Sequence, residues 1–148
     1  MTFRFLPTFQ AYLAGFLDAD GSIYVQAKPN STYRYGFQVA PYIVLYQSQK
    51  TKPEFEKLCS QINLGHMRER KDGILEYIIS RQEELKLFVG LVKPYLVLKQ
   101  RQIALLEKVF QVKQSVKTGK DFAKLLQLIN SFRELNYSKK RKIRRLTP

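Results

Sequence analysis

The sequence has little cysteine and no long apolar run. Cys59 is the only cysteine among 148 residues, so no internal disulfide can form, and its neighbours Leu58 and Ile62 predict a buried thiol in a reducing compartment. No apolar run is long enough to cross a bilayer, and residues 1–7 lack the basic and apolar segments of a signal peptide. We therefore expect a soluble, intracellular protein without a targeting peptide or a membrane partner.

The sequence is also short of acidic residues. Asp and Glu number 12 against 26 Lys and Arg, which gives a formal net charge of +14. No acidic residue lies between Asp20 and Glu54, and the stretch from Lys139 to Arg145 is basic at every position but one. Such a charge attracts polyanions, and a basic face with a basic tail indicates nucleic acid. A membrane surface is less favoured, because the tail has little apolar character with which to insert.

Histidine is nearly absent as well. The single His66 has no Cys or His partner at metal-ligand spacing, which argues against a zinc site and favours a position on a sheet surface. The chain length suits one domain. We expect residues 1–148 to form it, with a core over about 8–135 and a basic tail over 138–148.

Hydrophobic periodicity predicts an ordered series of helices and strands. Thr51 and Glu54 offer a capping box for one helix, Asp72-Gly73 offers a hairpin turn, and Pro41 should interrupt its strand. The expected helices cover residues 8–17, 51–62, 85–92, 99–112 and 121–134, and the expected strands cover 22–28, 35–47, 66–71 and 74–80. This order predicts an α+β fold, in which helices cover one face of a single antiparallel sheet.

The other face of that sheet would be polar, basic and aromatic, which is unusual unless it meets a ligand. Two-stranded β-ribbons fit the DNA major groove, where Arg68 and Arg70 suit guanine and Gln26 and Gln38 suit adenine. Side chains that could touch thymine methyls or grip phosphates, and other expected DNA contacts, are Tyr24, Lys28, Asn30, Thr32, Tyr33, Arg34, Ala40, Tyr42, Val44, Lys50, His66, Glu76, Ile78, Ser138, Lys139 and Lys142. We expect double-stranded DNA, and no small-molecule substrate.

The segment Leu13-Ala-Gly-Phe-Leu-Asp-Ala-Asp-Gly21 carries the chemistry. Asp18 and Asp20 fall at the C-terminal end of an apolar helix, where the helix dipole disfavours carboxylates. Two explanations remain open: a local turn in which Asp caps backbone amides, or a bound Mg²⁺ that reverses the repulsion of phosphate. Ala11, Gly15 and Ala19 recur every four residues, so they allow a close helix contact, within one subunit or between two.

Residues 13–21 resemble the LAGLIDADG motif of homing endonucleases, with Phe16 and Leu17 in place of Leu and Ile. The resemblance extends from Tyr12 to about Lys142, and is strongest to single-motif members encoded by group I introns. Further segments that carry it are Gln26-Ala-Lys-Pro-Asn30, Arg68-Glu-Arg70, Pro94-Tyr-Leu-Val-Leu-Lys-Gln-Arg-Gln102 and Leu135-Asn-Tyr-Ser-Lys139. It implies an αββαββα core with a curved antiparallel DNA-binding sheet backed by helices.

The resemblance also implies a mechanism. Asp20 and the carbonyl of Ala19 would bind Mg²⁺, for which Mn²⁺ can substitute, and a water would attack each scissile phosphate. One motif per chain implies a homodimer, with Ala11, Tyr12, Gly15, Phe16 and Ala19 at the dimer interface. Such an enzyme makes a double-strand break in a long pseudo-palindromic DNA site and so promotes intron mobility.

The supporting residues are less sharply defined. The family places a glutamine near the end of the second strand, for which ungapped counting selects Gln47 and the local string Ser48-Gln-Lys-Thr51 favours Gln49. Lys99 matches the family's catalytic lysine, although a simple phosphate contact is its alternative. A basic residue expected at position 51 is absent, and Lys50 or Lys52 could replace it.

Other functions of the same fold stay open at this point. A catalytically silent DNA-binding protein and an intron RNA maturase share the architecture, whereas an RNA-binding protein of ribosomal type leaves Asp18 and Asp20 unexplained. The family implies that the gene lies in an organelle, a chloroplast or a mitochondrion.

Overall fold

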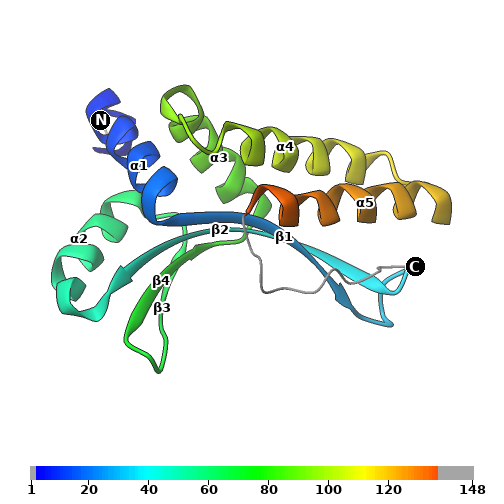
Figure 1. The fold of residues 1–148 in the computed structure, drawn as a ribbon, viewed down its shortest axis with the longest axis horizontal. Helices are drawn as coiled ribbons and strands as arrows, with labels where there is room; N and C mark the ends of the chain where they lie inside the picture. The colour runs from blue at the N-terminus through cyan, green and yellow to red at the C-terminus, as the bar shows by residue number, and fades with distance from the viewer. Residues whose placement is uncertain (1–2, 137–148) are drawn as a thin grey trace. The chain divides into compact units, whose positions relative to one another are not determined.

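The computed structural model describes residues 3–136. The predicted tail 138–148, with the expected phosphate contacts Ser138, Lys139 and Lys142, lies outside the described residues. The elements, in chain order, are α1 (Pro7–Asp20), β1 (Gly21–Pro29), β2 (Phe37–Ser48), α2 (Lys52–Ile62), β3 (His66–Glu69), β4 (Ile74–Ile79), α3 (Gln82–Val92), α4 (Gln100–Gln114) and α5 (Gly119–Leu135) (Figure 1). Short 3-10 turns η1, η2 and η3 cover Phe3–Phe5, Gln49–Thr51 and Lys93–Tyr95. The predicted order of elements is therefore confirmed.

The chain divides into two compact units that share one strand. Among the described residues, the first unit comprises 3–22 and 42–100, and the second comprises 23–41 and 101–136, so β2 begins in the second unit and ends in the first. The sheet order is β1-β2-β4-β3, and β4 pairs antiparallel with both β2 and β3. This confirms the α+β class with a single antiparallel sheet.

The core of the first unit lies on one face of its strands. Ile43 pairs with Ile79 and Leu45 with Tyr77, and all four side chains are buried. The apolar sides of α1 and α3 complete this core with fully buried Leu13, Leu17, Leu85 and Phe88. Burial of each such side chain stabilises the fold by roughly 1.5–3 kcal/mol, which fixes the end of α1 relative to the strands.

The phenol of Tyr77 positions the start of β3. Its hydroxyl oxygen accepts hydrogen bonds from the backbone N–H groups of Leu64 (2.9 Å) and Gly65 (2.8 Å), and burial raises the pKa of Tyr77. Both N–H groups would otherwise lack a protein partner at the turn that leads into His66. The β3–β4 hairpin therefore leaves the core in a defined direction.

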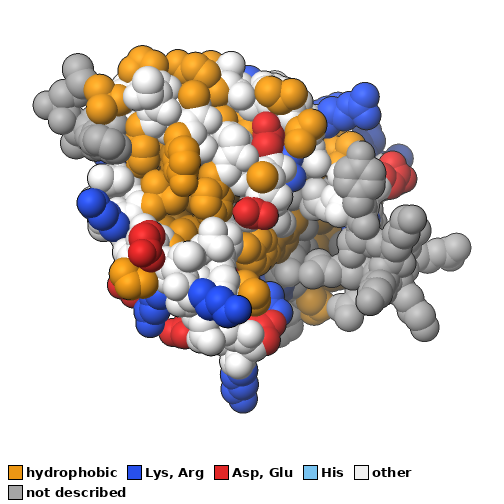
Figure 2. All heavy atoms as spheres, turned by 60° about the vertical axis from the view of Figure 1, so that its left-hand side comes forward, with side chains coloured by type: hydrophobic (Ala, Val, Ile, Leu, Met, Phe, Trp, Pro, Cys, Tyr) orange, Lys and Arg blue, Asp and Glu red, His pale blue; other side chains and the backbone are white. Residues whose placement is uncertain are grey.

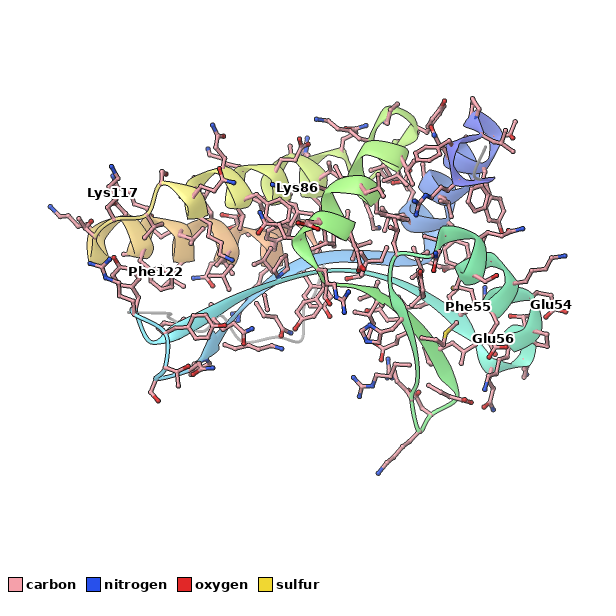
Figure 3. All side chains as sticks on the ribbon, turned by 180° about the vertical axis from the view of Figure 1, so that it is seen from behind. Glu54, Phe55, Glu56, Lys86, Lys117 and Phe122 are labelled. Atoms are coloured by element: carbon pink, nitrogen blue, oxygen red, sulfur yellow. The ribbon has the colours of Figure 1, made fainter. Side chains whose placement is uncertain are left out.

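The second unit joins the β1–β2 hairpin to two helices. Tyr35 and Phe37 stack on Phe122 near the start of α5, with ring centroids 4.9 and 6.2 Å apart. Phe122 is labelled in Figure 3. At the far end of α5 the Asn136 side chain donates to the carbonyl of Ile23, at 2.9 Å. The loop end of the β1–β2 hairpin is thus held at the start of α5, and the beginning of β1 is held at the end of α5.

Two local predictions were wrong. β2 runs through Pro41 without a break. The ladder between β2 and β4 begins only at Ile43, so the missing N–H of Pro41 removes no hydrogen bond from that ladder. Thr51 does not cap α2 through its side chain, since its hydroxyl donates to the carbonyl of Ser48 (3.2 Å). A capping box is instead present at Thr118 and Asp121, where α5 begins.

Cys59 is a buried free thiol, as predicted, and burial raises its pKa to about 12. A thiol with that pKa stays protonated and unreactive at neutral pH. Within residues 3–136, no helix is both long and apolar enough to span a membrane.

Candidate functional site

The end of α1 is set by a close backbone approach at Gly21. A Cβ atom at Gly21 would lie 2.5 Å from the Leu17 Cδ1 atom and 2.8 Å from the Leu17 carbonyl oxygen, so any other residue would push the helix end aside. Because β1 begins at this glycine, the chain passes from helix to strand without a loop. Asp18, Ala19 and Asp20 thus occupy the last turn of α1.

The two motif aspartates have different surroundings. The Asp18 carboxylate accepts hydrogen bonds from the backbone N–H groups of Val97 (2.8 Å) and Lys99 (3.0 Å), and the Lys99 ammonium donates to the Asp18 carbonyl oxygen (3.0 Å). Asp20 is exposed, and its carboxylate forms no hydrogen bond or ion pair with any described residue from 3 to 136. Asp18 therefore caps backbone amides, but these amides belong to a loop that is distant in sequence and not to a local turn. Asp20 remains available to a ligand.

The surroundings of Asp20 fit a hard divalent cation. An exposed carboxylate and the outward carbonyl oxygens of a helix end are oxygen donors, which Mg²⁺ prefers. Among the described residues, no group of three His, Cys, Asp or Glu side chains could enclose a metal ion. Mg²⁺ often binds through only one or two carboxylates, with waters and substrate phosphates completing its shell, so a single exposed Asp20 per chain matches that coordination.

Three lysines compete for the basic positions near the site. Lys99 is half-buried and tied to the last turn of α1. Lys52 is engaged elsewhere: its ammonium lies 3.0 Å from a Glu69 carboxylate oxygen, and that hydrogen bond and charge raise the pKa of Lys52. Lys50 is exposed and makes no ion pair with another described residue, which makes it the freer cation of the two that flank Thr51.

The two candidate glutamines face different neighbours. Strand alternation puts Gln47 on the same face as Leu45, and its side-chain oxygen accepts from the backbone N–H of Ser48 at 2.9 Å. Gln49 lies against the β3–β4 turn, where its backbone N–H donates to the Gly73 carbonyl at 2.9 Å. A Cβ atom at Gly73 would lie 3.0 Å from the Gln49 side-chain Cδ and Nε2 atoms, and Gly73 has a φ of 82°. The side chain of Gln49 is therefore packed against the β3–β4 turn.

The β3–β4 hairpin presents the two arginines expected to read guanine. Arg68 is paired with Glu76 across the strands, with its Nε atom 3.9 Å from a carboxylate oxygen. An Arg70 guanidinium nitrogen lies 2.6 Å from a carboxylate oxygen of Asp72 in the turn. Both guanidinium groups stay exposed, so they are oriented by carboxylates and still accessible to a base edge.

The expected DNA contacts are exposed, half-buried or buried, and the buried ones are described separately below. The loop after β1 is shaped by Asn30, whose side-chain oxygen accepts from the N–H (3.0 Å) and hydroxyl (2.6 Å) of Thr32. Exposed residues are Lys28, Thr32, Tyr33, Arg34, Lys50, His66, Arg68 and Arg70, and half-buried residues are Tyr24, Gln26, Asn30, Gln38, Tyr42, Glu76 and Ile78.

Ala40 and Val44 are the two expected DNA contacts that are buried. Their side chains are buried, with 8% and 0% of their surface exposed. A base edge cannot reach a side chain that the protein itself covers. A DNA contact of Ala40 and Val44 therefore stays a prediction with little side-chain surface to support it, whereas Gln38 and Tyr42 on the same strand parity keep part of their surface exposed.

The outer side of α1 is an exposed face of small and aromatic residues. Ala11, Tyr12, Gly15 and Ala19 are exposed, and half-buried Phe16 stacks on Phe55 with ring centroids 5.9 Å apart; Phe55 lies between outward-pointing Glu54 and Glu56 on α2 (Figure 3). A Cβ atom at Gly15 would have no neighbour within 4 Å. The row of small residues is therefore unused within the described chain.

Sequence reasoning missed two further apolar residues. Val97 and Leu98 are 77% and 72% exposed, and their loop is bonded to Asp18 of α1. Figure 2, in which the side of α1 and α2 comes forward, shows hydrophobic side chains gathered on this face of the molecule. Apolar surface of this kind indicates a contact with another protein surface. The sequence carried the signal as an apolar triplet, Leu96-Val-Leu98, next to Lys99.

Comparisons with known proteins agree with this geometry. A family model described as LAGLIDADG endonuclease matches residues 13–109. The chain is 34% identical to DNA endonuclease I-CreI of Chlamydomonas reinhardtii over 143 residues, which are 96% of this chain and 87% of the relative. It is 33% identical to DNA endonuclease I-CvuI of Chlorella vulgaris over 119 residues, which are 79% of this chain and 71% of the relative.

Solved structures are similar over nearly the same length. The crystal structure of I-CvuI with its DNA target in the presence of Ca has a TM-score of 0.83 and 27% identity, and covers 93% of this chain and 87% of that one. The structure of I-CvuI with the I-CreI target in the presence of Mg, in which the DNA is not cleaved, has a TM-score of 0.81 and covers 90% and 85%. These similarities point to the use of a divalent metal.

Proposed function

The chain belongs to the LAGLIDADG endonuclease family, and from this premise we propose that it is a site-specific homing endonuclease that cuts both strands of DNA as a homodimer. The observation that carries the proposal is the exposed Asp20, which ends α1 without a partner among residues 3–136 while Asp18 is fully engaged. A carboxylate left free at an unfavourable helix end, in a strongly basic chain, is best explained by a cation that it binds.

The catalytic residues of the chain have separable tasks. Asp20 and the Ala19 carbonyl would hold the divalent ion, for which we propose Mg²⁺ with Mn²⁺ as a substitute. When bound, that ion supplies Lewis acidity, which lowers the pKa of water and stabilises the leaving oxygen. Lys99 places a positive charge near the phosphate, and Gln47 orients the attacking water. Lys50 is the proposed replacement for the basic residue that the family has at position 51.

The dimer follows from the number of motifs. One chain supplies one Asp20, and cleavage of two strands requires two. Closed twofold symmetry is the commonest way to bring two copies together. The unused row of Ala11, Gly15 and Ala19 would let two α1 helices approach closely, and exposed Val97 and Leu98 would extend the contact. A twofold protein reads a pseudo-palindromic site.

DNA recognition is assigned to the β3–β4 hairpin of the first unit and to the β1–β2 hairpin of the second unit, each taken by itself. The residues that would read bases are Arg68, Arg70, Gln26 and Gln38, while Lys28 and Arg34 would contact phosphates. We also propose that residues 1–148 act as one endonuclease domain, since the family match over 13–109 includes parts of both compact units. The tail from Ser138 would add phosphate contacts.

Replacement of either arginine should relax sequence preference locally. We expect Arg68→Ala or Arg70→Ala to weaken specific binding by about 1–3 kcal/mol and to reduce the discrimination between bases at one or two base pairs in each half-site. Selection of bound duplexes from a library, with each variant, measures this. As a contrast, removal of the chain from Lys139 onward should weaken binding to all DNA similarly and lower its salt dependence. Sequence preference lost on tail removal alone would overturn the assignment of the sheet as reader.

The two glutamines should differ in their effect on cleavage. We expect Gln47→Ala to slow single-turnover cleavage by at least about tenfold, equivalent to about 1.4 kcal/mol of barrier, with DNA affinity unchanged. Gln49→Ala should cleave at a rate close to that of the wild type, because Gln49 packs on the hairpin turn. Rapid-mixing cleavage assays on matched substrates compare them. A slow Gln49→Ala with a normal Gln47→Ala would reverse the assignment.

The proposed function is tested by capture of cleaved ends. The protein is incubated with a library of randomised duplexes and Mg²⁺, and the new ends are ligated to adaptors and sequenced. We expect one long pseudo-palindromic site to dominate, cut on both strands. Enrichment of bound duplexes without new ends would instead support the silent DNA-binding alternative, and enrichment of neither would favour an RNA maturase.

The proposed biological setting is a mobile intron. A double-strand break at an intron-free site would promote copying of the intron into it. We propose that the gene lies in an organelle genome, with the chloroplast favoured because the two relatives come from the algae Chlamydomonas reinhardtii and Chlorella vulgaris.

A further inference from the structure

One residue of the motif, Asp18, makes contacts that metal binding does not require. Its carboxylate oxygens accept from the backbone N–H groups of Val97 and Lys99, which lie 79 and 81 residues further along the chain. Hydrogen bonds to an ionised acceptor are stronger than neutral ones. Both carboxylate oxygens of Asp18 are thus engaged with the loop, whereas the carboxylate of Asp20 has no hydrogen-bond partner among residues 3–136.

The loop that Asp18 holds has few other attachments. It joins η3 to α4, and Val97 and Leu98 contribute almost no burial because they are 77% and 72% exposed. Leu96 is buried, and the Gln100 side chain closes the loop by donating to the carbonyls of Lys93 (2.8 Å) and Leu96 (2.9 Å). Those contacts fix the start of the loop, whereas Asp18 fixes the part that carries Lys99.

Asp18 contacts Lys99 at both ends of that residue. The Asp18 carboxylate holds the Lys99 backbone N–H, and the Asp18 carbonyl oxygen accepts from the Lys99 ammonium at 3.0 Å. A lysine side chain has many rotamers, and ordering it is costly unless both ends are fixed. Here one residue fixes both, so the ammonium is held at the same helix turn that carries Asp20.

We propose that Asp18 is a positioning residue for cleavage, whose task is to set the Lys99 ammonium relative to Asp20. The inference rests on the proposed function, because it takes Lys99 as a contributor to cleavage. The two carboxylates of the motif then have different roles: Asp20 binds the ion, and Asp18 fixes the position of the Lys99 ammonium. Neither carboxylate can replace the other.

A double-mutant cycle tests the proposal. Asp18→Asn keeps the size and the carbonyl of the residue but turns one acceptor into a donor that faces an N–H group. We expect it to slow single-turnover cleavage about tenfold to a hundredfold, as expected for a displaced catalytic group, with DNA affinity and half-maximal Mg²⁺ concentration unchanged. In a Lys99→Met background, Asp18→Asn should change the rate less than about twofold, because residues that act as a unit are non-additive.

Controls separate positioning from folding. Asp121 also accepts backbone N–H groups, from Lys117 and Thr118, so Asp121→Asn removes a similar cap far from Lys99 in sequence and should leave cleavage unchanged. Should Asp18→Asn not fold, Val97→Pro deletes one donor N–H with Asp18 intact. Leu96 is already extended, with φ −67° and ψ 140°, as a residue before proline must be. Val97→Pro should cleave at least about tenfold more slowly than Val97→Ala.

The outcomes are distinguishable. A wild-type protein that leaves all DNA intact would overturn the proposed function itself. Equal rate losses from Asp18→Asn with and without Lys99 would overturn the positioning role, as would a shift in the Mg²⁺ dependence, which would make Asp18 a metal ligand. Equal rates for Val97→Pro and Val97→Ala would also contradict it.

Discussion

Asp20→Asn should abolish metal-dependent cleavage while specific DNA binding largely survives. The variant keeps the shape of the side chain but removes the charge that holds the cation, so we expect a loss of roughly 10³-fold or more in the single-turnover rate. The fold should not suffer, because Asp20 is exposed and bonds to no described residue from 3 to 136. Removal of a negative charge from a helix C-terminus should leave the melting temperature equal or slightly higher.

The measurement pairs cleavage with binding on the same purified sample. Gel-shift affinity for the selected site reports binding, and a time course in Mg²⁺ reports cleavage. Asp121→Asn is the matched control, since it removes a carboxylate elsewhere and should cut normally. An Asp20→Asn protein that cuts near the wild-type rate would show that Asp20 is not the metal ligand.

Gly15→Leu should separate the dimer without unfolding the subunit. A side chain at Gly15 meets nothing within 4 Å in the single chain, so leucine fits, and it stabilises a helix interior by up to about 1 kcal/mol relative to glycine. In a dimer, however, two leucines would meet where two helix backbones should touch. We expect a folded monomer with cleavage of both strands lost.

The chain offers a matched control for this substitution. Gly90 is also exposed on a helix of the same unit, α3, and a Cβ atom there likewise has no neighbour within 4 Å. Gly90→Leu should therefore keep both the dimer and the activity. Sedimentation equilibrium with and without DNA compares the two variants. A wild-type monomer that cuts both strands, at concentrations where no dimer is detectable, would refute the twofold architecture.

Local patterns in the sequence were sufficient to predict the order of helices and strands. Alternation in β4 and the Asp72-Gly73 dipeptide placed the hairpin, and Gly73 indeed has a φ of 82°. The motif placed Asp20 at a helix end for a physical reason, since Gly21 is required where Leu17 comes so close. Such features depend on residues near each other in sequence.

Contacts between residues far apart in the sequence could not be predicted in the same way. The bonds from Asp18 to the loop before α4 join residues 79 and 81 positions apart, and the Lys52–Glu69 pair joins residues 17 apart. No periodicity encodes such partners, so the roles of Asp18 and Lys52 could not be assigned. Alternation also gives the side of a strand but not the depth, which is why Val44 was placed on the DNA face and is buried.

Whether the chain cuts DNA is decided by incubating a supercoiled plasmid that carries the selected site with the wild-type protein, in Mg²⁺ and in excess EDTA. We expect linear plasmid in Mg²⁺, with both strands cut at the centre of the site, and intact supercoiled plasmid in EDTA. Plasmid that stays supercoiled in Mg²⁺, while the same protein binds the site tightly, would contradict this expectation.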